Sequence, residues 1–242
     1  MPRPQRTAVG DLVYHVLNRA NGRMPLFEKR GDYQSFLKVF AQAHEKVSMC
    51  TLAYCIMPNH WHMVLWPKGD RDLSVFMHWL TTTHTQRWLT ERNIVGFGHV
   101  YKGRFKSFAV QDDHHYLTVC RYVERNALRA GLVESAQDWP WCSAHQRLSG
   151  ATDGVPPLDQ GPLAFPDSWL DILNTDQDGK EVQAVRGCLV RDRPYGEDHW
   201  VEQAAQRLGL PLILRSRGRP KGRKRGLTPF PANPMFFGSD DA

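Results

Sequence analysis

The 242-residue sequence has no apolar run that approaches the ~20 residues needed by a membrane-spanning helix. No apolar segment follows the charged start of the chain, so we expect neither a secretory signal nor a membrane partner. The five cysteines are scattered and form no CxxC pair, which argues against a disulfide framework and against a zinc knuckle. These absences are typical of a cytoplasmic protein with reduced thiols.

Acidic residues are also missing from one segment, residues 215–225 (RSRGRPKGRKR), which contains seven Lys or Arg. Removing those seven from the 31 basic residues leaves 24 against 25 acidic ones, so the net charge of +6 belongs to this segment. We predict a basic arm, disordered until it binds an anionic partner such as a phosphate backbone. Arg217, Arg219 and Lys221 are its candidate DNA contacts. RGRP resembles the core of an AT-hook, but a general phosphate-binding arm is favoured.

The predicted elements follow the order β-α-β-β-α-β-α. Strands are expected at 11–18, 49–57, 57–67 and 105–111, and helices at 31–46, 73–92 and 114–130. The first six elements match the split β-α-β pattern of ferredoxin-like folds. We therefore predict an α+β fold whose antiparallel sheet has helices on one face and leaves the other face free for a ligand.

The composition changes after residue 148, where Gly, Pro and Asp become frequent and helical spacing returns only later. The sequence predicts four regions: a main domain at 8–148, a connector at 149–166, a small helical region at 167–212 and a basic, disordered tail at 213–242.

The stretch MPNHWHMVLWP at 57–67 places His60 and His62 two residues apart on a predicted strand. Residues i and i+2 share a face, so both imidazoles face one side while Trp61 faces the core. Such a pair can bind a metal ion, although alone it is more often two solvated side chains. Mg²⁺ or Mn²⁺ would also require an oxygen ligand.

The predicted helix 114–130 carries two tyrosines on different stripes. Tyr116 shares its stripe with apolar residues and is predicted to lie in the core. Tyr122 shares a polar stripe with Arg125, Asn126 and Arg129. On such a stripe Asn126 can supply an oxygen ligand and the arginines can neutralise phosphate oxygens. The alternative, a surface tyrosine without a catalytic role, stays open at this point.

The motifs MPNHWHMVLWP, YKGRFKSFAVQ (101–111) and RYVERNALRAGLV (121–133) together resemble the HUH single-tyrosine transposases, and more narrowly the REP-associated tyrosine transposases. The resemblance covers about residues 11–225. It implies a domain that cuts single-stranded DNA by attack of a tyrosine on a phosphate, leaving a 5′-phosphotyrosine link and a free 3′-OH. By position, Tyr122 is the nucleophile, and His60, His62 and Asn126 hold Mg²⁺ or Mn²⁺; the type of residue at the Asn126 position varies among relatives.

Two further segments are candidate DNA contacts. Aromatic and basic residues interleave in YKGRFKSF at 101–108, a pattern that can stack bases and hold phosphates through Lys102, Arg104 and Lys106. The polar loop after the first strand offers Arg19 and Arg23. An ordinary strand with solvated lysines and a plain turn are the competing interpretations.

The resemblance implies single-stranded or hairpin DNA, in REP-like repeats, as the partner, in a bacterial cytoplasm and near the nucleoid. One tyrosine per chain leaves monomer and homodimer open. Two other functions are kept as alternatives: a nucleic-acid-binding module that does not cut, and a metallonuclease that uses water.

Overall fold

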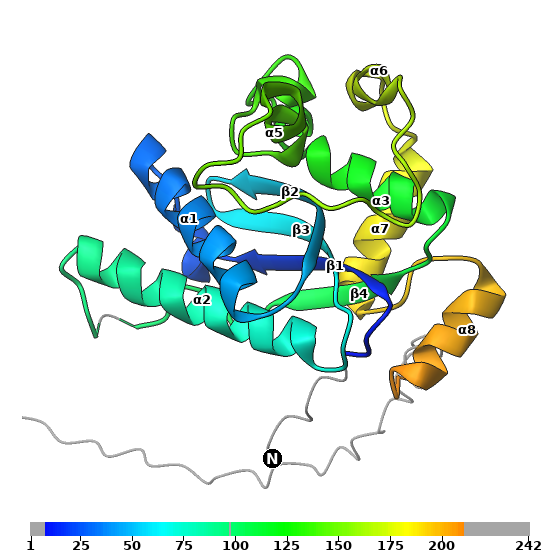
Figure 1. Ribbon diagram of the computed structural model, residues 1–242, viewed down its shortest axis with the longest axis horizontal. Coiled ribbons are helices and arrows are strands. Elements are labelled where there is room, and N and C mark those ends of the chain that lie inside the picture. Colours follow the sequence, from blue (N-terminus) through cyan, green and yellow to red (C-terminus); the bar gives the residue numbers. More distant parts are fainter. Residues whose placement is uncertain (1–7, 97, 211–242) are drawn as a thin grey trace, which may run out of the picture.

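The computed structural model describes residues 8–96 and 98–210, and its centre is a four-stranded antiparallel sheet (Figure 1). The strands lie in the order β2-β3-β1-β4. Their bounds are β1 Val13–Arg19, β2 Cys50–Met57, β3 His60–Trp66 and β4 Lys106–Val110. This order and the helices between the strands confirm the predicted α+β, ferredoxin-like class, and each predicted strand is present with its bounds shifted by a few residues.

Two long helices, α1 (Arg30–Lys46) and α2 (Asp72–Glu91), cover one face of the sheet. Their apolar stripes pack with the β3 side chains that point the same way, and Trp61, Phe36 and Phe76 are fully buried in this cluster. Trp61 therefore faces the core and both neighbouring histidines face the opposite side, as the strand alternation predicts.

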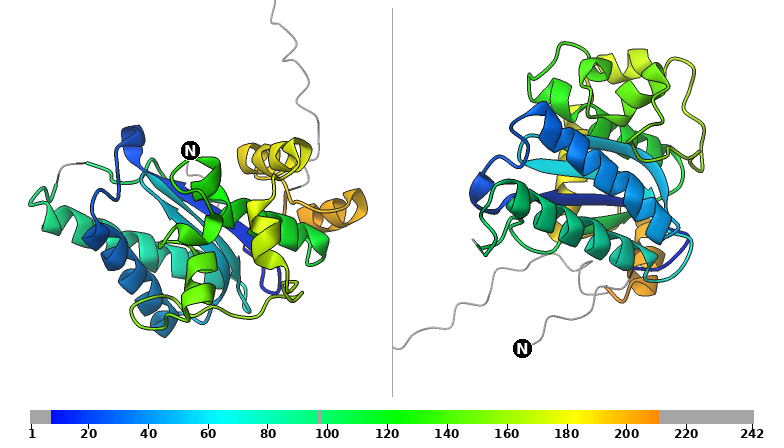
Figure 2. Two further views of the ribbon diagram at one scale, coloured as in Figure 1. Left: turned by 90° about the horizontal axis from the view of Figure 1, so that it is seen from above. Right: turned by 60° about the vertical axis from the view of Figure 1, so that its left-hand side comes forward.

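The opposite face of the sheet is not open, which corrects one part of the sequence prediction. Helix α3 (His114–Glu124) and helix α7 (Gly179–Arg191) lie across it, on the far side from α1 and α2 (Figure 2). Apolar residues of the sheet, α3, α6 and α7 form a second buried cluster there. The face carries enough apolar side chains, among them Val64, Phe108 and Val110, to be covered by helices rather than by solvent.

A buried carboxylate fixes α3 against the later helices. Glu124, at the end of α3, is fully buried and accepts hydrogen bonds from Trp169 Nε1 at 2.8 Å, from the Ser143 hydroxyl and from the Arg147 guanidinium. Ser143 and Arg147 belong to α5 (Ser143–Ser149), and Trp169 opens α6 (Trp169–Asn174). A buried charge of this kind is stable only when its oxygens are paired, and here the pairing joins three helices.

The predicted helix 114–130 is two helices, α3 and α4 (Asn126–Arg129), with a break at Arg125. The Arg125 guanidinium donates to the carbonyl oxygens of Leu173 and Thr175 and pairs with Asp176 Oδ1 at 3.2 Å. Its side chain therefore satisfies carbonyls at the end of α6, where a helix leaves them without internal partners. This contact is long-range and has no signal in the local pattern.

The remaining elements are η1 Asn21–Arg23, η2 Ala136–Asp138 and α8 Asp198–Arg207. Helix α5 was not predicted, whereas α6, α7 and α8 lie within the predicted helical region 167–212. Because α6 and α7 share one core with α3 and the sheet, these two helices pack on the main domain. The division into domain, connector, helical region and tail stays a prediction, and residues 213–242 lie outside the described residues.

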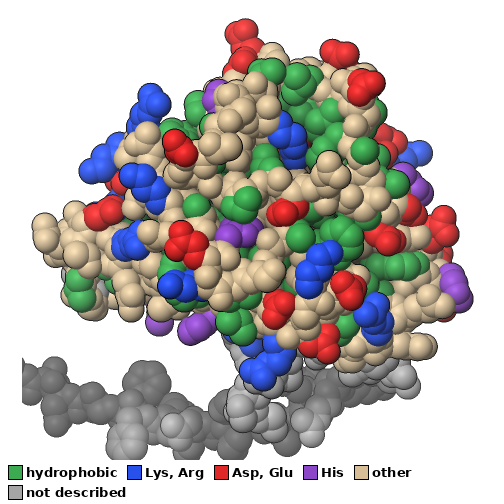
Figure 3. All heavy atoms as spheres, in the orientation of Figure 1, with side chains coloured by type: hydrophobic (Ala, Val, Ile, Leu, Met, Phe, Trp, Pro, Cys, Tyr) green, Lys and Arg blue, Asp and Glu red, His purple; other side chains and the backbone are tan. Residues whose placement is uncertain are grey.

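Within the described residues, none of the helices combines the length and apolarity required to cross a bilayer. Basic and acidic side chains are interspersed over the face that carries α1 and α2 (Figure 3). This face presents no continuous field of one sign of the kind that attracts a polyanion.

Candidate active site

A pocket of about 530 Å³ lies between the second face of the sheet and helices α3, α4 and α7. It brings together six residues that the sequence analysis singled out: Arg19, His60, His62, Tyr122, Asn126 and Arg129. Side chains of α7 complete the wall, among them Arg186 and Leu189. The volume is within the range of ligand sites, and the residues come from three separate parts of the chain.

Both histidines of β3 are held with one ring nitrogen available to the pocket. His60 Nδ1 lies 2.7 Å from the side-chain oxygen of Asn59, so Nδ1 carries the proton and Nε2 keeps a lone pair. Burial, with the Arg19 guanidinium adding to it, lowers the pKa of His60 to about 4. His62 is buried at 3% exposure, and burial, followed by the neighbouring histidines, lowers its pKa well below the ordinary value. Both rings are therefore neutral at pH 7, the form that ligates metals.

The second nitrogen of His62 is held by another histidine. His15 Nε2, on β1, lies 2.9 Å from His62 Nδ1, and His15 has no exposed surface. The strand register explains the contact: His15 pairs with Val64, so His62 is its diagonal neighbour on the same face. When His62 Nδ1 donates this hydrogen bond, the lone pair of His62 lies on Nε2. Ligating histidines are commonly fixed through their other nitrogen in this way.

The ring of Tyr122 packs edge-on against that of His62, with 5.8 Å between ring centroids. Tyr122 is 5% exposed and lines the pocket, whereas Tyr116 lies fully buried in the core, as predicted. Of the predicted polar stripe, Tyr122, Asn126 and Arg129 thus line the pocket. The guanidinium of Arg129 lies 4.3 Å from the centroid of the Tyr122 ring, which places a cation beside the phenol.

The break after α3 orients Asn126. Its Nδ2 donates to the carbonyl oxygens of Tyr122 and Val123 at 3.2 and 3.1 Å. Since the amide nitrogen is committed to these acceptors, Oδ1 is on the other side of the amide. Asn126 lines the pocket with Tyr122 and the two β3 histidines, so it brings an oxygen to the same hollow.

The charge of the pocket is uniformly positive. Three arginines line it, Arg19, Arg129 and Arg186, and none of its described lining residues is acidic. Burial, and then the nearby guanidiniums of Arg186 and Arg125, lower the pKa of Arg129. Like charges held this close favour an anion between them, and arginine binds phosphate with a matching fork of donors.

The donors in the pocket fit a divalent ion. Two neutral imidazoles and one amide oxygen form a mixed nitrogen and oxygen set of the kind that Mn²⁺ accepts. The set carries no negative charge, unlike the carboxylate-rich sites typical of Mg²⁺. A metal held by His60, His62 and Asn126 would therefore lack a protein anion in this pocket.

Several predicted DNA contacts do not reach the pocket. Arg125 is 6% exposed and is directed at α6, so the structure gives it a structural position instead of the predicted place beside a phosphate. Lys102 and Arg104 are exposed in the segment before β4, and Lys106 Nζ donates to the Leu189 carbonyl at 3.1 Å. Arg23 lies in η1, but its side chain is not among the parts that the structure describes. Arg217, Arg219 and Lys221 lie outside the described residues.

A second group of potential ligands lies at the start of α3, where donor atoms of Asp113, His114 and His115 are within 4.8 Å of one another. Asp113 Oδ1 accepts from the backbone N–H of His115 at 2.9 Å and faces His115 Nδ1 at 2.8 Å. These bonds cap the helix, which accounts for the grouping without a metal.

Sequence reasoning missed His15 and Arg186. Helix α7 had a usable signal, because Asp178 precedes it as an N-cap and Val182, Val185 and Leu189 follow at helical spacing. His15 had none, since its partner depends on the register between β1 and β3.

Residues 8–126 match the family described as Transposase IS200 like. The chain is 27% identical over 124 residues to a Haemophilus influenzae protein assigned to the REP-associated tyrosine transposases, covering 48% of this chain and 70% of that protein. It is 25% identical over 109 residues to the REP-associated tyrosine transposase of Escherichia coli K12, covering 44% and 59%. A solved structure of a REP-associated tyrosine transposase bound to a REP hairpin superposes with a TM-score of 0.51 at 18% identity, covering 68% of this chain and 95% of that one. This last similarity confirms the fold.

Proposed function

Because residues 8–126 are an IS200-like transposase domain, we propose that this protein cuts single-stranded DNA at hairpin-forming repeats and transfers the cut strand, with Tyr122 as the nucleophile. One observation carries the proposal. Tyr122 shares a pocket with a histidine pair, an amide oxygen and three arginines, without an acidic residue among the described lining. A hydroxyl nucleophile beside a site for an anion is the arrangement that attack on a phosphodiester requires.

In the proposed step, Tyr122 Oη attacks the phosphorus of the scissile phosphate. A bond forms between Oη and phosphorus, and the bond between phosphorus and the 3′-oxygen breaks. The phenol loses its proton and the departing 3′-oxygen gains one, so the products are a 5′-phosphotyrosine and a free 3′-OH. The covalent link conserves the bond energy, and attack by another 3′-OH can rejoin strands without ATP.

Each pocket residue has a defined part in this proposal. Arg19, Arg129 and Arg186 bind the phosphate oxygens and stabilise the charge that develops on them. Arg129 also fixes α4 to α3 by donating to the Tyr122 carbonyl, which keeps the nucleophile in place. A divalent ion held by His60, His62 and Asn126 would polarise the phosphate. His15 orients His62 for that role.

A covalent-adduct assay separates this proposal from the alternatives. The protein is incubated with a hairpin oligonucleotide and Mn²⁺, and protein–DNA adducts are resolved on a denaturing gel. We expect an adduct with the wild type and with Tyr116→Phe, and none with Tyr122→Phe. Tyr116→Phe is a matched control because Tyr116 is a buried tyrosine of the same helix.

The other outcomes identify other functions. Cutting that persists in Tyr122→Phe without any adduct would indicate a nuclease that uses water. Binding of the hairpin without cutting by the wild type would indicate a binding module. Loss of the adduct in Tyr116→Phe and its persistence in Tyr122→Phe would contradict the assignment of the nucleophile.

A further inference from the structure

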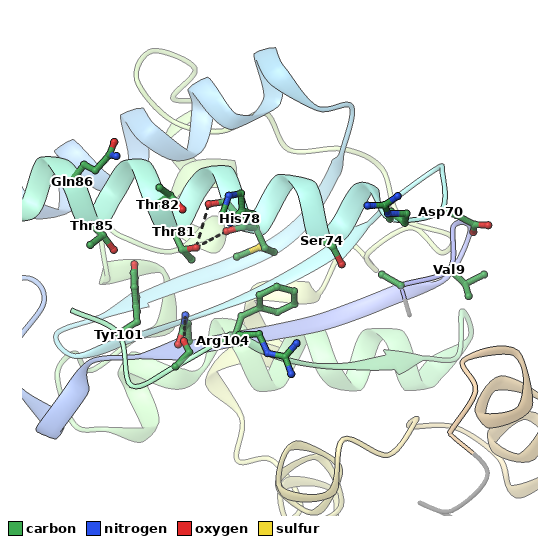
Figure 4. A pocket seen from close by; sticks show the side chains of 16 residues that line it. Val9, Asp70, Ser74, His78, Thr81, Thr82, Thr85, Gln86, Tyr101 and Arg104 are labelled. Atoms are coloured by element: carbon green, nitrogen blue, oxygen red, sulfur yellow. Dashed lines mark hydrogen bonds between the residues drawn. The ribbon is translucent and has the colours of Figure 1, made fainter. Parts of the chain in front are cut away.

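The cysteines gather on one side of the sheet. All five belong to the buried cluster on the second face or pack against it: Cys50, Cys55, Cys120, Cys142 and Cys188. The opposite face carries a larger hollow than the Tyr122 pocket, a groove of about 720 Å³ between α2 and residues 101–105 (Figure 4). The described residues that line this groove include hydroxyl, amide and imidazole groups but no cysteine. Thiol chemistry in this protein therefore belongs to the face that carries the Tyr122 pocket.

Two of the cysteines are partners across neighbouring segments. Cys55 in β2 pairs with Cys142 through an antiparallel bridge, although the two lie far apart in the sequence. The backbone N–H of Ile56, one residue after Cys55, donates to the carbonyl of Trp141, one residue before Cys142, at 2.9 Å. A bond in this position flanks the two cysteines, so they form a non-hydrogen-bonded pair.

This pairing gives the two cysteines the geometry of a disulfide. In a non-hydrogen-bonded antiparallel pair the Cα atoms are about 4.5 Å apart and the side chains lie on the same face. A disulfide spans Cα separations of roughly 4.4–6.8 Å. A bond between Cys55 Sγ and Cys142 Sγ can therefore form without a rearrangement of the backbone. In this structure both thiols are free, and neither has exposed surface.

A path for a small oxidant leads from the Tyr122 pocket to Cys55. Met57 lines the pocket, and its Sδ lies 3.7 Å from Cys55 Sγ. On its other side β2 is the edge strand of the sheet, and the chain around Cys142 covers that edge. A short covering segment can open locally while the rest of the fold stays intact, which admits a molecule as small as hydrogen peroxide.

The pair also lies between two parts of the Tyr122 pocket. Cys55 is the cross-strand partner of His62 in β3. Cys142 Sγ donates to the carbonyl of Glu124 at 3.7 Å, and Glu124 ends α3, the helix that carries Tyr122. A bond between the two sulfurs joins the strand next to the histidine pair to the segment that packs on the end of α3.

We propose that Cys55 and Cys142 form a redox site that small hydroperoxides convert to an intramolecular disulfide and that thiols restore. Cys55 sulfur attacks one peroxide oxygen: an S–O bond forms, the O–O bond breaks, and the thiol proton leaves with the other oxygen as water. Cys142 sulfur then attacks the sulfur of this sulfenic acid. The S–S bond forms, the S–O bond breaks, and the oxygen leaves as water with the Cys142 proton. The thiols lose two electrons, which reduce the peroxide to water.

The disulfide stabilises the fold around the pocket when the surroundings become oxidising. It encloses β3, β4 and helices α2, α3 and α4 in one covalent loop. A cross-link that closes a long loop restricts the unfolded chain strongly and so favours the folded state. Its formation requires neither DNA nor a metal ion, so this inference is independent of the chemistry proposed for Tyr122.

Thiol counting by intact-mass spectrometry tests the proposal on the full-length chain. The reduced protein is treated with hydrogen peroxide under native conditions and then unfolded in an alkylating reagent. We expect two fewer alkylated cysteines than in the untreated protein, a peptide that joins Cys55 to Cys142, and full reversal by dithiothreitol. Cys55→Ala and Cys142→Ser should each abolish this cross-link. Cys188→Ser should leave it unchanged and is the matched control, because Cys188 is a buried thiol of α7 that faces the Pro194 carbonyl.

Thermal unfolding provides a second readout. Oxidation should raise the melting temperature by about 5–10 °C in the wild type and in Cys188→Ser, and should not raise it in Cys55→Ala. An unchanged thiol count, a cross-link to a different cysteine, or a disulfide that forms only in denaturant would overturn the proposal. So would a sulfoxide on Met57 in place of the cross-link, or a cross-link that leaves the melting temperature unchanged. The peptide map of the wild type decides the outcome even where a variant fails to fold.

Discussion

His15 Nε2 lies 2.9 Å from His62 Nδ1, and both imidazoles are buried between the sheet and α3. The contact determines which nitrogen of His62 can face a metal. If His62 donates from Nδ1, its Nε2 keeps a lone pair that can bind a metal; if His15 donates instead, His62 Nδ1 is the acceptor and Nε2 carries the proton. His15 Nδ1 is a buried atom without a hydrogen-bond partner among the described residues, so the rest of the fold does not fix its tautomer.

Replacing His15 should therefore weaken metal binding, although His15 is not itself one of the proposed metal ligands. We expect His15→Ala to reduce the Mn²⁺ affinity about 10- to 100-fold, the range typical for loss of an outer-shell partner. His15→Gln, which keeps a side-chain acceptor, should recover part of the loss. Electron paramagnetic resonance of Mn²⁺ measures the affinity of both variants. The hairpin oligonucleotide is present, and each variant also carries Tyr122→Phe. Unchanged affinity in His15→Ala would show that His62 needs no such support.

Metal and DNA should bind cooperatively. The three guanidiniums repel a divalent cation, and no described residue lining the pocket supplies a negative charge, so the DNA phosphate must supply it. We expect the Mn²⁺ Kd to fall at least about tenfold when the hairpin is bound, with the reciprocal effect on DNA affinity. Mn²⁺ should bind more tightly than Mg²⁺, because imidazole suits it better. A Mn²⁺ Kd independent of DNA would contradict this account.

Substitution of Arg186 and of Arg125 should distinguish an arginine that contacts a phosphate from one that stabilises the fold. Arg186→Ala removes an exposed guanidinium of the pocket, so DNA binding should weaken and the slope of log K against log salt should fall by about one, with the melting temperature unchanged. Arg125→Ala removes the guanidinium that donates to the carbonyls of Leu173 and Thr175, of which Thr175 keeps a second donor in Arg121, and should cost about 2 kcal/mol of stability. If Arg125→Ala instead lowers the salt slope at full stability, the assignments are reversed.

Asp32 should make the fold sensitive to acid. Burial raises its pKa, but the backbone N–H groups of Glu28 and Lys29 and the Arg92 guanidinium, at 2.9 Å, outweigh burial and leave the pKa lowered. A lowered folded-state pKa contributes stability that is present above the unfolded value of ~4 and is lost as the pH falls through the folded pKa.

Chemical denaturation between pH 7 and pH 2 measures the Asp32 contribution. Asp32→Asn should lower the free energy of unfolding by about 1–3 kcal/mol at pH 7 and converge with the wild type at the acid end. Parallel curves for the two proteins over this range would show that Asp32 does not carry the dependence.

Local sequence patterns were enough to predict the strands of the sheet and three residues of the site, His60, His62 and Tyr122. Alternation along 57–67 predicts that His60 and His62 share a face, and helical spacing separates Tyr122 from Tyr116; both arrangements are found. The features that local patterns could not predict depend on contacts between residues that are far apart in the sequence. The break at Arg125 follows from carbonyls at the end of α6, about 50 residues later in the chain. The covered second face follows from α7, and the orientation of His62 follows from strand pairing with β1.

The most direct test of the central claim is to identify the amino acid that carries the DNA. The wild-type protein is trapped on a hairpin oligonucleotide with an unpaired flank, digested with trypsin and nuclease, and analysed by tandem mass spectrometry. The account predicts a nucleotide attached through its 5′-phosphate to Tyr122. A nucleotide on any other residue, or cut DNA with no modified peptide, would contradict it.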